Sequence, residues 1–265
     1  GIRDQPRSRG LGDVYKRQAA HSLKDLPTEL PAGLTLGSIT RREDPREVLL
    51  YRDRSDRRGF APGLTINQLP ADLTVATSSP RRKAQLIKLR PDWNVIEIRG
   101  NVPTRLAKLH EGQYDAIVLA AAGLIRHGHQ QDASALNLDR FVNLRLDPSV
   151  FVPAPAQGAL ALQCREGDRV IDAVFPLHDV STSGPVRAER ELLRLVDGGC
   201  NLPFGAWCHR LDGGDLELMS VLESNGGLVR ESGRSNNPEE LAAALWGQRS
   251  HALPEMPTDD TSLEA

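Results

Sequence analysis

The sequence contains few aromatic residues and few cysteines. Phe, Trp and Tyr together make up 4% of its 265 residues, so a hydrophobic core has to be built mainly from aliphatic side chains. The three cysteines are Cys164, Cys200 and Cys208, and an odd number at these spacings does not form a disulfide framework. We therefore expect a reducing compartment, in which each cysteine is either buried or used for chemistry.

Long hydrophobic runs and an excess of one charge are also missing. No apolar stretch approaches the roughly 18 residues that cross a bilayer, and no apolar segment near the start resembles a secretory signal. Lys and Arg number 33 against 35 Asp and Glu, which gives a net charge of -2, whereas nucleic-acid-binding domains are usually basic. These features predict a cytoplasmic protein that binds neither membranes nor nucleic acid.

Residues 1–18 differ from the rest of the chain. The segment GIRDQPRSRGLGDVYKRQ is rich in arginine, shows no clear periodicity and ends abruptly where AAHSLKDLP begins. Its second half resembles translated sequencing-adaptor read-through, so we interpret the segment as non-native and leave it out of the fold prediction. A native basic arm is the alternative interpretation.

The region from residue 70 to 126 alternates between strand and helix patterns. Three short apolar runs predict strands, at 73–76, 95–99 and 115–120. Two helices are predicted between them, from Pro80 to about Leu89 and from Pro103 to Gly112. Ser79 is the expected N-cap of the first helix. The alternation predicts a βαβαβ unit with a parallel sheet.

The C-terminal third predicts a smaller α+β domain. A helix is expected over residues 185–196, and glycine-containing turns then separate three alternating runs that suit an antiparallel sheet. These runs are GAWCHRL, LELMSVLES and GLVRES. A helix near residues 238–247 completes the domain, and the polar tail from about residue 249 is predicted to be disordered.

Five arginines are predicted to meet at one edge of the parallel sheet. They end strands or open helices, and they are Arg81, Arg82, Arg99, Arg105 and Arg126. Ligands of such sheets bind beyond the carboxyl ends of the strands, beside helix N-termini that favour anions. Because guanidinium groups match carboxylates, we expect a ligand with several carboxylates. The alternative is a solvated face with structural ion pairs.

The segment HSLKDLP carries a second polar cluster. Lys24 and Asp25 stand just before a proline, and an aspartate that stays ionised beside a cation can stabilise positive charge or move a proton. From spacing alone, however, a surface ion pair in a turn is the favoured interpretation.

Cys200 is the cysteine with a candidate chemical role. It follows Gly198 and Gly199 on a predicted loop, where a thiolate can serve as a covalent attachment point. A buried, inert thiol is the alternative. Cys164 and Cys208 alternate with apolar neighbours and are interpreted as structural, and no histidine pair has the spacing of zinc ligands.

At these positions the chain resembles the porphobilinogen deaminase family, also called hydroxymethylbilane synthases. Six segments look like that family's motifs and occur in its order. They are HSLKDLP, TSSPRRKAQL, IRGNVPTRLAKL, YDAIVLAAAGLIR, PAPAQGALALQCR and ERELLRLVDGGCNLPFGA, within residues 19–210.

The resemblance implies a transferase of tetrapyrrole and heme biosynthesis. The reaction would be the stepwise head-to-tail condensation of four porphobilinogen molecules into hydroxymethylbilane, with release of ammonia. Cys200 would carry a dipyrromethane cofactor through a thioether, and Asp25 would be the catalytic aspartate. The implied cofactor-binding residues are Lys24, Asp25, Ser79, Arg81, Arg82, Arg99 and Arg105, and the implied substrate-binding residues are Arg99, Arg105 and Arg126.

The resemblance also implies the fold. Two α/β domains like type II periplasmic binding proteins are expected at 19–45 with 151–176 and at 46–150, followed by a small α+β domain at 177–265. A monomer without a metal is expected. The family's opening strand, its arginine–serine cofactor contact and its lysine-bearing mobile loop should precede HSLKDLP. Nothing before Ala19 matches them, so the first domain is expected to be incomplete. A non-catalytic anion-binding module and an inactive fragment of the enzyme are the alternatives.

Overall fold

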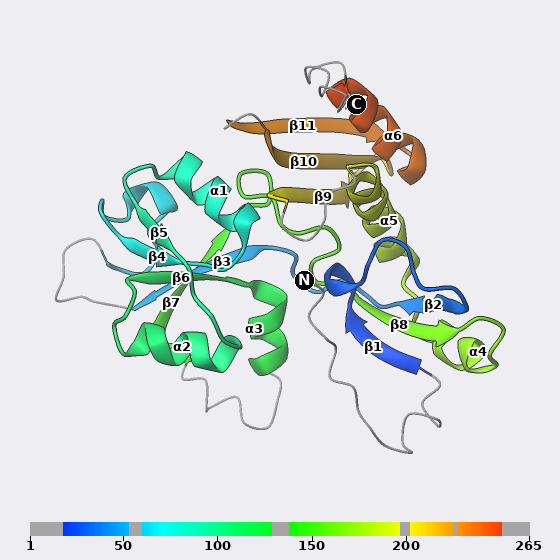
Figure 1. The fold of residues 1–265 in the computed structure, drawn as a ribbon, viewed down its shortest axis with the longest axis horizontal. Coiled ribbons are helices and arrows are strands. Elements are labelled where there is room, and N and C mark those ends of the chain that lie inside the picture. The colour runs from blue at the N-terminus through cyan, green and yellow to red at the C-terminus, as the bar shows by residue number, and fades with distance from the viewer. Residues whose placement is uncertain (1–17, 53–59, 129–137, 197–201, 225–226, 251–265) are drawn as a thin grey trace, which may run out of the picture.

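The computed structural model describes residues 18–52, 60–128, 138–196, 202–224 and 227–250, which form three β-sheets with helices packed against them (Figure 1). From Gln18 on, the described chain runs through a three-stranded sheet, crosses into a five-stranded sheet, returns to the first, and then forms a third sheet. The candidate site depends on the two segments in which the chain crosses between the first two sheets.

The five-stranded sheet is mixed. Its order is β5 (Asn94–Ile96), β4 (Thr74–Ala76), β6 (Ala116–Ala120), β3 (Glu47–Arg52) and β7 (Phe141–Leu146). β4 is parallel to β5 and β6, whereas β3 is antiparallel to β6 and β7. The helices around it are α1 (Pro80–Leu89), α2 (Val102–His110) and α3 (Ala121–Gly128).

Both faces of this sheet are buried under helices. On one face Leu86 of α1 packs in a cluster with Val75, and on the other Leu106 of α2 and Leu124 of α3 pack with Ile117. In Figure 1 α1 accordingly lies on the opposite side of the sheet from α2 and α3. The nearly all-apolar sequence of β6 follows from this double coverage.

The predicted βαβαβ unit is confirmed. Ser79 is the N-cap of α1, since its side chain accepts from the backbone N of Arg82 at 3.4 Å. The strand predicted over 95–99 ends earlier than expected, at Ile96. Its pairing stops there because its partner strand β4 ends at Ala76, which lies opposite Ile96.

The C-terminal sheet is antiparallel, as predicted. It contains β9 (Phe204–Arg210), β10 (Leu216–Ser224) and β11 (Gly227–Ser235), and it packs against α5 (Val180–Leu195) and α6 (Pro238–Ser250). The predicted start of the first helix at Pro185 is wrong. Asp179 caps α5 by accepting from the backbone N of Thr182 at 2.7 Å, and Pro185 lies inside the helix at the cost of one backbone hydrogen bond.

The remaining sheet has the order β1 (Gln18–Ser22), β8 (Leu160–Arg165) and β2 (Leu34–Ile39), with antiparallel pairing throughout. A short helix, α4 (Val170–Val174), follows β8. β1 leads directly into a 3₁₀ helix, Leu23–Asp25, which presents two of the candidate site residues. The domain boundaries expected from the sequence stay predictions.

The two crossing segments, 40–46 and 153–159, run side by side. Thr40 N donates to Leu160 O, and Glu43 N donates to Gly158 O, both at 3.0 Å. Gln157 Nε2 also donates across to the carbonyl oxygen of Pro45 at 2.8 Å. The crossings therefore form one hydrogen-bonded ribbon between the two sheets.

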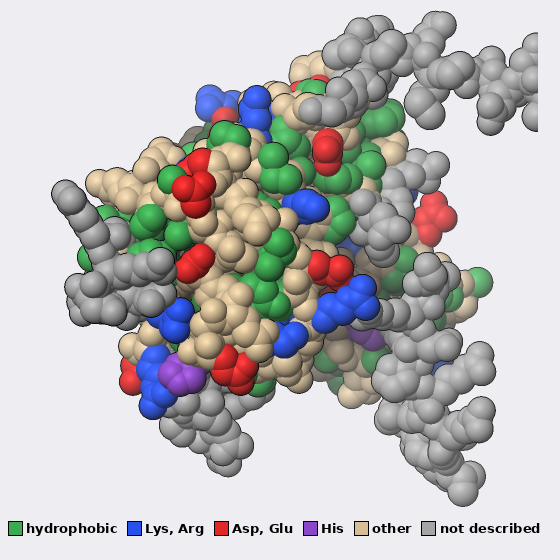
Figure 2. Space-filling model, turned by 60° about the vertical axis from the view of Figure 1, so that its left-hand side comes forward, with side chains coloured by type: hydrophobic (Ala, Val, Ile, Leu, Met, Phe, Trp, Pro, Cys, Tyr) green, Lys and Arg blue, Asp and Glu red, His purple; other side chains and the backbone are tan. Residues whose placement is uncertain are grey.

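Charge is mixed over the surface. On the face shown in Figure 2, acidic and basic side chains are interspersed among polar and apolar ones, so no field of one sign covers it. None of the helices within the described ranges combines the length and the apolar character that a bilayer-crossing helix needs.

The close approach at Gly158 provides a test of the crossing ribbon. Gly158 has φ +91°, and a Cβ there would lie 2.3 Å from the carbonyl oxygen of Glu43. We expect Gly158→Ala to lower the free energy of unfolding by about 3 kcal/mol or more, through strain and the clash with backbone. Gly33→Ala is the matched control, because φ is +81° but nothing lies within 4 Å, and it should cost only about 1 kcal/mol. Equal costs in denaturant unfolding would contradict this account.

Candidate anion-binding site

The site is built around the start of α1. The turn after β4 leads into this helix, so that Arg81 and Arg82 lie in its first turn and point back over the sheet. Arg81 Nη2 lies 2.6 Å from Glu47 Oε1, and Arg82 Nη2 lies 2.8 Å from Glu47 Oε2. The two guanidiniums also donate to the carbonyl oxygens of Val152 and Val118, at 2.7 and 3.1 Å. Both arginines are therefore buried and fixed, not free on a solvated face.

Arg105 joins this cluster from α2. Its Nε donates to Gly100 O at 2.7 Å, and its Nη2 donates to Ser78 Oγ at 3.0 Å. Burial lowers the pKa of Arg105, and the nearby charge of Arg82 lowers it further. The starts of α1 and α2 thus bring guanidinium groups together, as the strand–helix order predicts.

Lys24 and Asp25 approach from the other sheet. Lys24 is half-buried, and its Nζ donates to Gln157 Oε1 at 3.2 Å, while Asp25 is exposed. Burial lowers the pKa of Lys24 to about 8, and the positive charge of Arg82 adds to the effect. Lys24, Arg81 and Arg82 therefore act on one another electrostatically, although they come from segments far apart in sequence.

Positive charge exceeds negative charge in this cluster. Burial by itself would raise the pKa of Glu47, but the two guanidiniums lower it to about 2. The negative charges that act on Lys24 are the carboxylates of Glu47 and Asp25. The positive charges of the cluster are Lys24, Arg81, Arg82 and, beside them, Arg105. Arg82 Nε is buried and has no hydrogen-bond partner among the described residues. The arrangement suits an anionic ligand, which would supply the missing negative charge.

The other predicted site residues make their contacts outside the Glu47 ion pairs. Arg99 is 79% exposed and pairs with Glu97 at 3.0 Å. Arg126 donates to the carbonyl oxygen of Gly158 at 2.7 Å, which places it at the crossing ribbon. Ser79 is half-buried and caps α1, and Cys200 lies outside the described residues.

Sequence reasoning missed one acid and one amide that hold the cations in place. Glu47 fixes Arg81 and Arg82, and Gln157 holds Lys24. Both are fully buried polar residues. Glu47 precedes the apolar run VLLY of β3, and Gln157 follows two Pro-Ala pairs in the segment PAPAQG. A single polar residue inside an apolar stretch is the signal that could have identified them.

The two cysteines that the structure describes are buried, which is in keeping with the structural role predicted for them. Cys164 and Cys208 are free and buried. Burial raises the pKa of both thiols, and the nearby charge of Glu189 raises that of Cys208 further. Among the described residues, no group of three or more His, Cys, Asp and Glu side chains could hold a metal ion.

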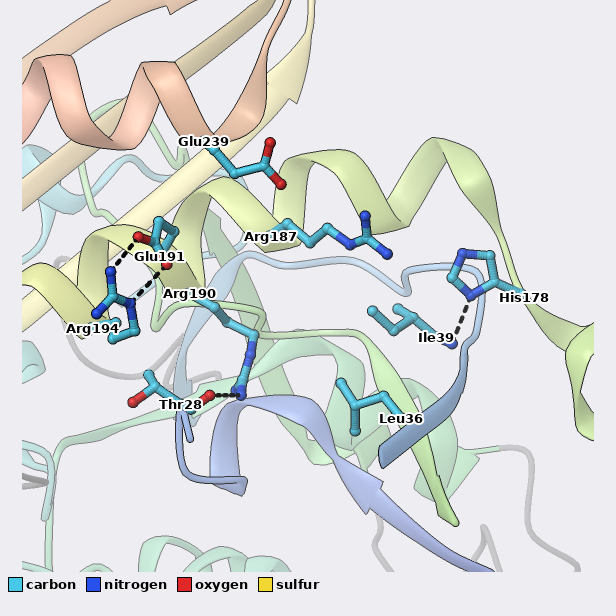
Figure 3. Close-up of a pocket in the computed structure, with 9 residues that line it drawn as sticks. All are labelled: Thr28, Leu36, Ile39, His178, Arg187, Arg190, Glu191, Arg194 and Glu239. Carbon is cyan, nitrogen blue, oxygen red and sulfur yellow. Dashed lines mark hydrogen bonds and ion pairs between the residues drawn. The ribbon is translucent and has the colours of Figure 1, made fainter. Parts of the chain in front are cut away.

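A separate cavity lies beside α5 and contains no predicted site residue. Its volume is about 240 Å³, and Arg187, Arg190, Glu191 and Arg194 line it from that helix (Figure 3). Arg194 is paired with Glu191 at 2.7 Å. The cavity carries charge of both signs, since Glu191 and Glu239 line it together with the three arginines.

Family models match most of the chain. "Porphobilinogen deaminase, dipyromethane cofactor binding domain" covers residues 14–173, and "Porphobilinogen deaminase, C-terminal domain" covers residues 185–249. The first match starts inside the segment interpreted as non-native, and Gln18 is paired in β1. The interpretation of residues 1–18 therefore stays a prediction.

Curated relatives carry the same name. Porphobilinogen deaminase from Thermus thermophilus is 47% identical over 205 residues, which are 77% of this chain and 62% of the relative. That from Roseiflexus sp. is 42% identical over 231 residues, 86% of this chain and 70% of the relative. The chain thus spans roughly two thirds of the length of these relatives.

Solved structures match the chain only weakly. An ancestral cationic amino acid solute binding protein has a TM-score of 0.31 and 13% identity, with 52% of this chain and 54% of that chain covered. A periplasmic binding protein from Brucella ovis with glutathione bound has a TM-score of 0.33 and 17% identity, with 62% and 44% covered. Nothing about function follows from scores this low. The sheets and helices described above confirm the predicted α/β class with a small α+β unit toward the C-terminal end, and the likeness to type II periplasmic binding proteins stays a prediction.

The ion pairs of Glu47 predict a component of acid stability. Ionised Glu47 stabilises the fold above its ordinary pKa of 4.5, and this contribution is lost as the pH falls toward about 2. The loss corresponds to about 3 kcal/mol of unfolding free energy. We expect Glu47→Gln to be less stable at neutral pH, with a stability curve flatter by that amount between pH 5 and 2.

Denaturant unfolding at several pH values measures this difference. Glu47→Asp keeps the carboxylate and should keep the acid dependence, even where the shorter side chain lowers stability. Parallel curves for the wild-type and Glu47→Gln chains would contradict the assignment.

Proposed function

The chain belongs to the porphobilinogen deaminase family, and on that premise we propose that it condenses porphobilinogen into hydroxymethylbilane on a dipyrromethane cofactor. The observation that carries the proposal is the surplus of buried positive charge around Arg82. Porphobilinogen and the dipyrromethane carry acetate and propionate side chains, which are the counterions that such a cluster lacks.

The described residues fit the cofactor. The charge of Arg82 acts on both Lys24 and Arg105, and the carboxylates that act on Lys24 are those of Glu47 and Asp25. Arg82 Nε is a buried donor without a partner among the described residues. These cations, with Arg81 and the hydroxyl of Ser79, would hold the carboxylates of a dipyrromethane. When bound, the cofactor supplies the terminal pyrrole carbon to which further pyrrole units are added.

Asp25 is the proposed catalytic residue. Its carboxylate is exposed beside Lys24 at the end of the 3₁₀ helix, on the side of the positive cluster. An ionised aspartate there can accept hydrogen bonds from pyrrole N–H groups and stabilise positive charge that develops on the rings. Lys24 and the arginines would hold the acidic side chains of the cofactor and substrate close to Asp25.

Arg99 and Arg126 are proposed to bind substrate. Arg99 is exposed at the end of the segment after β5, and its carbonyl oxygen accepts from Lys108 Nζ at 3.2 Å. Arg126 is half-buried on α3 and keeps guanidinium donors beyond the one bound to Gly158. Both can add charge-assisted hydrogen bonds to a growing polycarboxylate.

Cys200 is the proposed attachment point of the cofactor. α5 ends at Leu195, and Cys200 follows in a segment outside the described residues. Cys164 and Cys208 are poor alternatives, because burial raises the pKa of both thiols and disfavours the reactive thiolate. We further propose a cytoplasmic monomer that binds no nucleic acid, in keeping with its free buried cysteines and nearly balanced charge.

Intact mass tests the attachment. After incubation with porphobilinogen, the wild-type chain should carry an added mass of two or more linked pyrrole units and react with Ehrlich's reagent. Cys200→Ser should carry no such adduct, because a hydroxyl does not replace the thiolate as nucleophile.

Cys164→Ser is the matched control, and it should keep the adduct. An adduct that persists in Cys200→Ser would place the attachment elsewhere. A wild-type chain without an adduct would contradict the enzyme proposal and leave an anion-binding module or an inactive fragment.

A further inference from the structure

One guanidinium on α5 binds four carbonyl oxygens of the turn that presents Lys24 and Asp25. The donor is Arg190, and its Nη1 and Nη2 atoms divide the acceptors between them. The acceptors belong to Leu23, Leu26, Pro27 and Thr28, at 3.1, 3.1, 2.6 and 3.4 Å. The first two residues bracket Lys24 and Asp25 on either side.

The turn has few other fixed points. Its 3₁₀ helix is closed by one backbone hydrogen bond, from Leu26 N to Leu23 O at 3.3 Å, and Ser22 makes no side-chain cap. Leu23 N donates to Ala159 O at 3.0 Å, and the buried side chains of Leu23 and Leu26 pack in a cluster with Val186 of α5. A 3₁₀ turn this short is weakly stable on its own, so its geometry depends on these tertiary contacts.

The contacts of Arg190 distinguish it from a ligand-binding residue. The guanidinium is half-buried, burial lowers its pKa, and its hydrogen-bond partners are carbonyl oxygens without a carboxylate among them. Figure 3 shows the side chain extending from α5 along the cavity to Thr28. Arg187 lines the same cavity from the same helix, but among the described residues no hydrogen bond joins it to the turn.

Arg190 and the proposed attachment point are also near each other in the sequence, since α5 ends five residues before Cys200. We propose that Arg190 is a positioning residue, which fixes the Lys24–Asp25 turn on α5 and so holds the proposed catalytic carboxylate beside the cations around Arg82. The functional part of this inference rests on the proposed deaminase activity, whereas the positioning of the turn does not.

Hydrogen exchange of the 265-residue chain tests the positioning directly. In Arg190→Gln, amides within residues 22–28 should exchange about tenfold faster than in the wild type, since a charged anchor of the local structure is lost. Arg190→Lys should give an intermediate rate, because one ammonium can reach some of the carbonyls. Arg187→Gln should leave exchange in residues 22–28 unchanged. An unchanged rate in Arg190→Gln, or an equal rise over β9 and β10, would overturn the proposal.

Turnover adds a second readout that a general loss of stability would not give. Arg190→Gln should lower kcat with little change in KM, and Arg190→Lys should restore part of kcat. A raised KM with kcat unchanged would make Arg190 a ligand-binding residue and overturn the positioning role. If the wild-type chain neither loads the cofactor nor turns over, the deaminase proposal fails, and hydrogen exchange alone decides the role of Arg190.

Discussion

The architecture depends on the buried carboxylate of Glu189. Its two oxygens accept from both terminal nitrogens of Arg42, at 2.7 and 3.0 Å, and from the backbone N of Ala156 and of Cys208, at 2.5 and 2.7 Å. Arg42 and Ala156 belong to the two crossing segments, and Cys208 belongs to β9. A buried charge is tolerated only when it is paired and fully hydrogen-bonded, so the three sheets are joined where this carboxylate finds its partners.

In the candidate site, too, a buried carboxylate is paired with cations, but there the positive charges outnumber the negative ones. Glu47 neutralises part of the charge of Arg81 and Arg82, and Gln157 holds Lys24 through a neutral amide. Glu47 and Asp25 are the carboxylates among the described groups acting on Lys24, and they do not balance the cations of the cluster, which leaves positive charge for a ligand. The fold thus fixes the cations with a minimum of competing anions, which is the condition for binding a polycarboxylate tightly.

The parts predictable from sequence were those set by local patterns. The cap at Ser79, the helices after β4 and β5 and the glycine-linked C-terminal strands follow from turn chemistry and periodicity. Glu189 and Arg190 could not be assigned in this way, because each depends on a partner more than a hundred positions away, Arg42 for Glu189 and Leu23 for Arg190. The start of α5 was misplaced for a local reason, since the signal of Pro185 outweighed that of Asp179 in the sequence.

The pKa of Lys24 tests the central claim most directly, namely that this cluster holds the carboxylates of the cofactor. NMR titration of its side-chain amine should give a pKa of about 8 in the cofactor-free Cys200→Ser chain. In the loaded wild-type chain the pKa should rise toward its ordinary value of 10.5, because a bound carboxylate stabilises the ammonium form. The same pKa in the two chains would show that the cofactor binds elsewhere and would contradict the account.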